Sequence, residues 1–247
     1  MIKKIVVLAA GKGTRMLEYS KNQPKHLINI NHKPFLYYHF NNLKRAGFEE
    51  IIIVIGYKKE EMEKFDKKYG KKFNLKLIDQ FKEVGTKKYG TACPVAAVEK
   101  IVNQENFIVV NGDDLFSIED LKNIKKIDDN FCYAAGLTDK HPENYGIFKM
   151  TGKNIQGIME KPRPNIDFDA TQPEKYLINA GLYKFTPEIF KAIKKVTESP
   201  RGEYELTDAI SILAQKNKVR VFPIKKNRLT FSQPEDIKKM EKFLLKN

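Results

Sequence analysis

The chain has 247 residues, of which 41% are hydrophobic and 11% aromatic, and its formal net charge at pH 7 is +14. This length and apolar content suit one large α/β domain, and no apolar run approaches the eighteen residues of a membrane-spanning helix. Because the N-terminus also lacks a signal-peptide pattern, we expect a soluble, cytoplasmic protein. Cys93 and Cys132 lack CxxC spacing and the four histidines show no zinc pattern, so we expect reduced cysteines and no zinc site.

The positive charge is spread along the chain. Lysines occur as doublets interleaved with acids, as in Lys58-Lys59-Glu60-Glu61. This pattern is typical of solvated helix faces, although a basic patch that attracts anionic partners is the alternative. We therefore expect neither a nucleic-acid partner nor a membrane partner.

Apolar runs and helical periodicity alternate along the first half of the chain. Strands are predicted at about 3–9, 50–56, 74–79, 107–111, 131–137, 145–150, 154–160, 177–185 and 218–223. Helices are predicted at 34–46, 58–69, 94–102, 118–126, 187–195, 206–214 and 234–246. This order predicts an α/β fold with a Rossmann-like, doubly wound, mostly parallel sheet, followed by a strand-rich insertion in the second half.

The first strand opens into a glycine-rich loop. Ile5 to Ala10 form the apolar run, and Gly11-Lys12-Gly13-Thr14-Arg15 follow it. Two glycines let backbone N–H groups approach an anion closely, while Arg15 and Lys25 add positive charge, so the loop is predicted to bind phosphate. Met16 breaks the dinucleotide-binding fingerprint and the P-loop spacing is absent. A tight turn between a strand and a helix is the structural alternative.

Leu8 to Met16 and Pro24-Lys25 resemble the signature of the sugar-phosphate nucleotidyltransferases, also called nucleotide-sugar pyrophosphorylases. The resemblance implies catalytic roles for Arg15, Lys25 and Asp113. It also implies a nucleotide-binding loop formed by Leu8, Ala9, Ala10, Gly11, Gly13 and Thr14. By the same resemblance the single domain, residues 1–247, divides into a nucleotide-binding half (about 1–130) and a sugar-phosphate half (about 131–225).

A buried strand over 107–110 delivers Asn111-Gly112-Asp113-Asp114 to its carboxyl end, where open α/β sheets bind ligands. A carboxylate there can hold Mg²⁺, which prefers one or two carboxylates together with phosphates and waters. The resemblance assigns the metal to Asp113. Asp114 is expected to cap the helix over 118–126 or to hydrogen-bond nearby.

A base-binding segment is expected around Gln80, Gly90 and Thr91. An amide side chain can pair with the N3–H and a carbonyl of uracil or thymine, and a glycine beside it exposes backbone groups to the same base. The resemblance implies this role for Gln80 and for Tyr89-Gly90-Thr91-Ala92. About four extra residues within 81–88 leave the choice of base open, and an exposed strand-end role for Gln80 is the alternative.

Sugar-phosphate recognition is implied by motifs that follow in the family's order. These are Glu160-Lys161-Pro162, Asn179-Ala180-Gly181 and the segment 201–208, with Gly146 beside the sugar ring. Glu160 and Asn179 can bond hydroxyls and Lys161 can hold a phosphate. The predicted sugar-phosphate residues are thus Gly146, Glu160, Lys161, Asn179 and Thr207. Tyr183 and Phe185 are expected in the core.

The chain departs from the family pattern near its C-terminus. Thr230 stands where relatives carry the aspartate that is the second metal ligand, and a neutral hydroxyl is a poor substitute for a carboxylate. Asn227 is an alternative ligand in a shifted register.

The resemblance implies a Mg²⁺-dependent transfer of a nucleoside monophosphate from UTP or dTTP to a sugar-1-phosphate. Its partners would be these two substrates, and the sequence leaves room for a homo-oligomer. Two alternatives stay open: a cytidylyltransferase acting on a non-sugar phosphate, and a non-catalytic protein that binds nucleotides or sugar phosphates.

Overall fold

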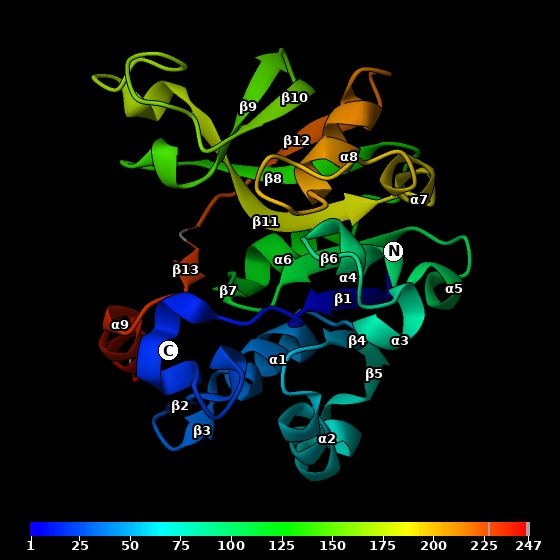
Figure 1. Ribbon diagram of the computed structural model, residues 1–247, viewed down its shortest axis with the longest axis vertical. Coiled ribbons are helices and arrows are strands. Elements are labelled where there is room, and N and C mark those ends of the chain that lie inside the picture. Colours follow the sequence, from blue (N-terminus) through cyan, green and yellow to red (C-terminus); the bar gives the residue numbers. More distant parts are fainter. Residues whose placement is uncertain (227, 246–247) are drawn as a thin grey trace.

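The apolar strands assemble into one large mixed sheet in the computed structural model, which describes residues 1–226 and 228–245. Within these residues the sheet has nine strands, in the spatial order β5 (Leu75–Asp79), β4 (Glu50–Ile55), β1 (Lys4–Leu8), β6 (Phe107–Asn111), β11 (Leu177–Phe185), β8 (Cys132–Thr138), β12 (Val219–Pro223), β10 (Asn154–Glu160) and β9 (Gly146–Thr151). Figure 1 shows the sheet running from β5 in the lower part of the molecule to β9 and β10 at the top.

The two halves of the sheet pair differently. β5, β4, β1 and β6 are parallel to one another, as predicted for the first half. β11 then runs antiparallel to both β6 and β8, and β12 returns parallel to β8. The predicted α/β fold is confirmed, and the sheet as a whole is mixed because the strand-rich second half continues it through β11.

Helices cover both faces of the sheet. They are α1 (Phe35–Arg45), α2 (Lys59–Phe73), α3 (Gln80–Val84), α4 (Ala92–Ala96), α5 (Glu99–Val102), α6 (Ile118–Ile124), α7 (Glu188–Ile193), α8 (Leu206–Ala214) and α9 (Glu235–Leu244). Residues of α1, α2 and α6 pack on one face and residues of α4, α7 and α8 pack on the other. In β1, Val6 points to the second face while Ile5 and Val7 point to the first, which follows from the two-residue period of a strand.

Two short ribbons lie beside the main sheet. β2 (Asn29–Ile30) pairs with β3 (Lys33–Pro34), and β7 (Asp114–Leu115) pairs with β13 (Leu229–Thr230). In Figure 1 the terminal helix α9, in red, lies beside the blue segment that holds β2 and β3. The Asn31 side chain donates to the backbone oxygen of Glu241 (3.2 Å), so α9 is tied to the first half.

Some elements differ from the sequence prediction. Gln80 begins a helix, α3, because the Asp79 carboxylate accepts from the backbone N–H groups of Phe81 and Lys82 and caps it. The single helix predicted over 94–102 is divided into α4 and α5, since Val98 leaves helical geometry (φ −100°, ψ 3°).

The carboxyl ends of the parallel strands meet at one edge. Leu8 at the end of β1 lies beside Val54 of β4 on one side and Asn111 of β6 on the other. The strand order reverses about β1, and such a switch point leaves a crevice at the carboxyl edge of the sheet. No helix among the residues with described structure is long and apolar enough to cross a membrane.

Candidate active site

The glycine-rich loop after β1 is shaped by Gly13 and Lys25. Gly13 has a left-handed backbone (φ +65°), and a Cβ there would lie 3.1 Å from the Lys25 side chain. Gly13 also accepts from the N–H of Met16 (3.0 Å), which starts the 3-10 turn Thr14–Ser20. The loop therefore needs glycine at position 13 to bring Lys25 against the strand ends.

Asp113 lies at the end of β6 and forms an ion pair with Lys25. The two side chains are only 18% and 11% exposed. Burial alone would raise the pKa of Asp113, but the charge and hydrogen bond of Lys25 outweigh burial and hold that pKa at about 2. Asp113 is therefore an ionised carboxylate at any physiological pH.

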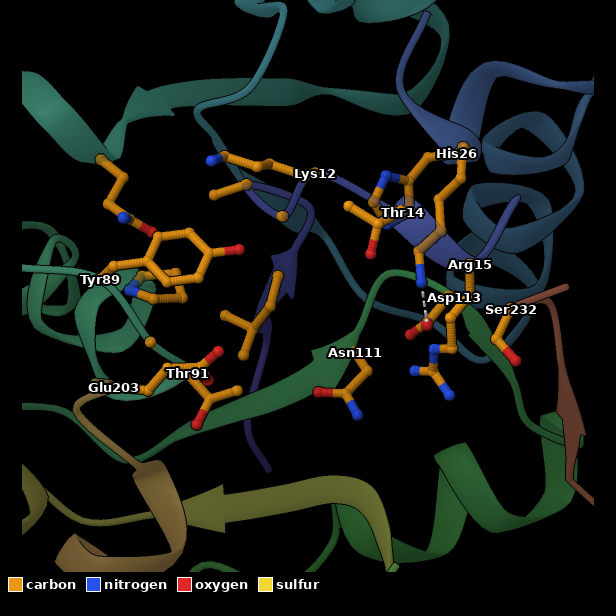
Figure 2. A pocket seen from close by; sticks show the side chains of 18 residues that line it. Lys12, Thr14, Arg15, His26, Tyr89, Thr91, Asn111, Asp113, Glu203 and Ser232 are labelled. Atoms are coloured by element: carbon orange, nitrogen blue, oxygen red, sulfur yellow. Dashed lines mark hydrogen bonds and ion pairs between the residues drawn. The ribbon is translucent and has the colours of Figure 1, made fainter. Parts of the chain in front are cut away.

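A first cavity, cavity 1, of about 340 Å³ opens at this edge of the sheet. It is lined by the glycine-rich loop, by the ends of β1 and β6, and by residues from α3, the 89–94 segment and two later segments. The predicted residues that line it are Leu8, Ala10, Gly11, Gly13, Thr14, Arg15, Lys25, Gln80, Gly90, Thr91 and Asp113. Figure 2 shows Arg15, Asp113 and Ser232 at one end of cavity 1, and Tyr89, Thr91 and Glu203 at the other.

One of the predicted nucleotide residues, Ala9, differs from the expectation. Ala9 does not line cavity 1, because its side chain is buried in the core and its N–H donates to the Val54 oxygen (3.0 Å). Gln80 lines the cavity as expected, and because it is only 2% exposed, the alternative of an exposed strand-end residue is wrong.

A second cavity, cavity 2, of about 520 Å³ adjoins the first. Arg15, Asn111, Asp113 and Ser232 line both cavities. Among the predicted sugar-phosphate residues, Lys161 and Asn179 line cavity 2. The Lys161 ammonium donates to the Asn144 backbone oxygen, and burial together with the charge of Arg15 lowers its pKa.

The other predicted sugar-phosphate residues are not part of the lining of either cavity. Glu160 pairs with Gly146 across β10 and β9, and a Cβ on Gly146 would lie 2.9 Å from a Glu160 carboxylate oxygen. Burial raises the pKa of Glu160. Thr207 is buried on α8, and its hydroxyl lies close to the Glu160 carboxylate, which offsets part of this rise in pKa. The two groups do not form a hydrogen bond of good geometry.

Thr230 faces Asp114 instead of Asp113. Its hydroxyl donates to Asp114 Oδ1 (2.7 Å), and Asp114 also accepts from Asn111 (3.1 Å) and pairs with Arg228 (3.6 Å). Burial raises the pKa of Asp114 to about 6, although the charge of Arg228 opposes the rise. Asp114 hydrogen-bonds as expected, but Ser117 caps the helix α6. Asn227 lies outside the described residues.

The segment 201–208 is predicted to serve sugar-phosphate recognition, and in the structure its residues 204–206 contact the segment 89–92. Tyr204 N–H donates to the Tyr89 oxygen (2.8 Å) and its own oxygen accepts from Ala92 (2.9 Å). The Thr91 hydroxyl donates to Glu205 (3.3 Å) and accepts from Leu206 N–H (2.9 Å). These bonds hold Glu203 in the wall of cavity 1.

Sequence reasoning missed several lining residues. Among those given no role from the sequence are Lys12, His26, Pro94, Asn111 and Ser232 in cavity 1, and Asp139, His141, Asn144, Arg228, Gln233, Asp236 and Lys239 in cavity 2. His26, next to Lys25, carried a local signal. It is 3% exposed, and burial followed by the charge of Lys25 lowers its pKa to about 3, so it stays neutral beside Asp113.

Residues 4–232 match the family model described as nucleotidyl transferase. The chain is 34% identical over 242 residues to the bifunctional protein GlmU of Methanocaldococcus jannaschii, covering 97% of this chain and 54% of that protein. It is 31% identical over 238 residues to the UTP–glucose-1-phosphate uridylyltransferase AglF of Haloferax volcanii, covering 94% and 92%. The chain thus spans about half the length of the bifunctional relatives.

Solved structures agree with this fold. A UDP-glucose pyrophosphorylase in complex with UDP-glucose superposes with a TM-score of 0.82 at 23% identity, covering 100% of this chain and 99% of that one. At this identity the likeness supports the arrangement of the strands and helices described above.

Proposed function

The chain belongs to the nucleotidyl transferase family, and from this premise we propose that it joins a nucleoside monophosphate to a sugar-1-phosphate, with release of pyrophosphate. The observation that carries the proposal is the junction of two cavities at Arg15, Asn111, Asp113 and Ser232. A transfer between two phosphates needs two binding sites that meet at the reacting phosphorus. Cavity 1 would hold the triphosphate and cavity 2 the sugar-1-phosphate.

The reaction needs no covalent enzyme intermediate. A phosphate oxygen of the sugar-1-phosphate is already an anion and attacks the α-phosphorus of the nucleoside triphosphate. The new P–O bond forms as the bond to the α–β bridging oxygen breaks, and pyrophosphate leaves with that electron pair. Catalysis then consists of aligning the groups and neutralising charge.

The chain supplies cations where this charge develops. Arg15 lines both cavities, and Lys25 lies at the same end of cavity 1, where it faces Asp113. We assign to them the neutralisation of the departing pyrophosphate. Lys161, in cavity 2, would hold the incoming phosphate as a point charge.

The donor set suits Mg²⁺. Asp113 offers an ionised carboxylate that lines both cavities, and Mg²⁺ is usually held by one or two carboxylates with phosphates and waters completing its shell. Across residues 1–226 and 228–245, no group of three or more acidic, histidine or cysteine side chains forms a protein-only cage. Asp113 would hold the ion, which would supply further positive charge to the triphosphate oxygens.

We favour UTP or dTTP as the nucleotide, because Gln80 and the backbone beside Gly90 lie together in cavity 1 and an amide can pair with the imide edge of uracil or thymine. The relative from Haloferax volcanii is named for UTP and glucose-1-phosphate, which supports the same class of substrates.

The test is a screen of pyrophosphate release with UTP, dTTP, CTP and ATP against several sugar-1-phosphates and several non-sugar phosphates, with and without Mg²⁺. We expect Mg²⁺-dependent release and a product whose mass equals a nucleotide sugar. Nucleotide binding without release under every combination would contradict catalysis and favour a binding protein. Release with a non-sugar phosphate and CTP alone would favour a cytidylyltransferase.

A further inference from the structure

Glu203 is a carboxylate in the wall of cavity 1, and the proposed reaction assigns no role to it. Among the described lining residues of this cavity, the carboxylates are Asp113 and Glu203. Asp113 is paired with Lys25 at the end that holds Arg15. Glu203 lies at the other end, beside Tyr89 and Thr91 (Figure 2).

The backbone around Glu203 is fixed by hydrogen bonds with the segment 89–92, which lies beside it in the wall of the cavity. Tyr204, its neighbour, exchanges backbone hydrogen bonds with Tyr89 and Ala92, and the Glu203 oxygen accepts from Ser199 N–H (2.8 Å). Gly90 permits this contact, because a Cβ there would lie 2.4 Å from the Tyr204 nitrogen. Glu203 is therefore held at the cavity by both halves of the chain.

Within the described part of the chain, the side-chain partner of the Glu203 carboxylate is another acid, Glu205, and no lysine or arginine forms an ion pair with Glu203. Arg201, the cation closest to it in sequence, donates to Glu205 instead (2.8 Å). Burial raises the pKa of Glu203, and so do the charge of the neighbouring Glu205 and a side-chain hydrogen bond with it. Donor groups on a bound ligand would satisfy the remaining hydrogen-bonding capacity of this carboxylate.

The chemistry of a nucleotide decides which part can supply those donors. A carboxylate repels the phosphates, which Arg15 and Lys25 attract at the far end. The ribose lies between the phosphates and the base, and its 2′- and 3′-hydroxyls form a pair of donors. A carboxylate is the side chain that binds such a diol with both oxygens, as acidic residues do in dinucleotide-binding folds.

We propose that Glu203 binds the ribose hydroxyls of the nucleoside triphosphate, so that the enzyme selects ribonucleotides over 2′-deoxyribonucleotides. This inference rests on the proposed function, since it assigns cavity 1 to the nucleotide. It names UTP as the preferred substrate over dTTP and makes Glu203 a specificity-determining residue.

The test compares UTP with dUTP, which differ only in the 2′-hydroxyl. Hydrogen bonds to a charged group are worth roughly a 10- to 100-fold preference, so wild-type kcat/KM should favour UTP by that factor. In Glu203→Ala the preference should fall to within about threefold, through loss of activity with UTP while activity with dUTP is retained. Glu198→Ala, an exposed acid on the adjoining segment, is the matched control and should keep the wild-type preference.

Three results would overturn the inference. They are a wild type that treats UTP and dUTP alike, a Glu203→Ala variant that keeps the preference, and a variant that loses activity equally with both nucleotides. If Glu203→Ala changes the ratio of kcat/KM for UTP and CTP but not the ratio for UTP and dUTP, Glu203 contacts the base and not the ribose.

Titration calorimetry of UTP and dUTP, without a sugar phosphate, separates this inference from the proposed reaction. If no pyrophosphate is released but UTP binds more tightly than dUTP in a Glu203-dependent way, the reaction is wrong and the assignment of Glu203 stands. If turnover is normal and the two nucleotides bind equally, the proposed reaction stands and the assignment of Glu203 to the ribose is wrong. If neither nucleotide binds, both are wrong.

Discussion

The pair formed by Asp113 and Lys25 concentrates opposite charges where the two cavities meet. Lys25 keeps Asp113 ionised, and Asp113 keeps an ammonium in a position that is almost buried. Removing one partner therefore changes both the electrostatics of the site and the desolvation of the other partner.

Asp113→Asn is expected to lower turnover by a hundredfold or more, because an amide keeps the shape but loses the charge that would hold Mg²⁺. Loss of one electrostatic stabiliser costs on the order of 3 kcal/mol in the transition state. Pyrophosphate release at saturating substrates measures the effect, and a melting curve checks that the variant is folded. A folded variant with more than about half the wild-type rate would show that Asp113 does not hold the metal.

His39 gives the protein a pH dependence on the acid side. It is 1% exposed and neither ring nitrogen has a hydrogen-bond partner in the described structure. Burial lowers its pKa to about 4. The unfolded chain, with an ordinary histidine pKa near 6.5, binds this proton more readily than the folded chain does, so stability falls as the pH drops from about 6.5 to 4.

His39→Phe should flatten this dependence by up to about 1.4 kcal/mol per pH unit, since it removes one group that must charge on unfolding. Phe35 and Phe40 already flank the ring at 6.1 and 6.0 Å, so an aromatic replacement suits the site. Urea unfolding between pH 4 and 7 measures the slope. His32→Asn, at an exposed position, should keep the wild-type slope, and an unchanged slope in His39→Phe would assign the acid sensitivity to other groups.

At the residue scale, what is local in the sequence could be predicted. The loop from Gly11 to Arg15 and the strand end at Asp113 carry their own signals, and both line cavity 1. The alternation of side chains along β1 could also have separated Ala9 from Leu8 and Ala10. Glu203 could not be assigned, because its position depends on backbone bonds between residues more than a hundred positions apart.

At the scale of elements, the short ribbon of β7 and β13 explains why the chain tolerates Thr230. Thr230 pairs with Asp114 in register, and its hydroxyl completes the hydrogen bonds of that buried carboxylate. The ribbon therefore uses position 230 to support Asp114. The sequence could predict the missing carboxylate, but it could not show which neighbour the hydroxyl would meet.

Thr230→Asp is expected to destabilise the fold, because it sets a second carboxylate against Asp114, which is 4% exposed and has Arg228 as its cation. Leaving a buried charge without its own partner costs about 2 kcal/mol or more, roughly 4–8 °C in Tm for a chain of this size. Thr230→Ser keeps the hydroxyl and should melt like the wild type. If Thr230→Asp melts normally and binds Mg²⁺ more tightly, position 230 is a metal-ligand site after all.

Among the elements, long apolar strands and amphipathic helices were predicted within a few residues, since burial of one face sets their period. The two-residue strands β2, β3, β7 and β13 carry too few residues for a period to be read. The helix α3 was missed although Asp79 stood at its N-cap, which is a signal that the sequence contains.

On the scale of the whole molecule, we propose that the division into a nucleotide half and a sugar-phosphate half is incomplete. Glu203 and Ser232 come from the second half, yet both line cavity 1. Arg15 comes from the first half and lines cavity 2 as well. Substituting a residue that lines one cavity should therefore change the kinetic constants of one substrate, whereas substituting a residue that lines both cavities should change those of both substrates.

Asn179→Ala should raise KM for the sugar-1-phosphate several-fold and leave KM for the triphosphate within about twofold, because Asn179 lines cavity 2 alone. Arg15→Ala should instead lower kcat/KM for both substrates by tenfold or more. Steady-state kinetics with each substrate varied in turn gives these constants. Equal rises in both Michaelis constants for Asn179→Ala would contradict a separate sugar-phosphate cavity.

The position of β12 has a consequence for how the chain folds as it is synthesised. β12 (Val219–Pro223) lies between β8 and β10, two strands that precede it by more than fifty residues. The first four parallel strands can pair once residue 111 has emerged from the ribosome, whereas β8 has a bare edge until residue 223 follows. Such long-range pairing is slow, and an unpaired edge is a site for aggregation. During refolding, the amides of β12 and those of β8 that face β12 should therefore be the last in the sheet to gain protection from hydrogen exchange.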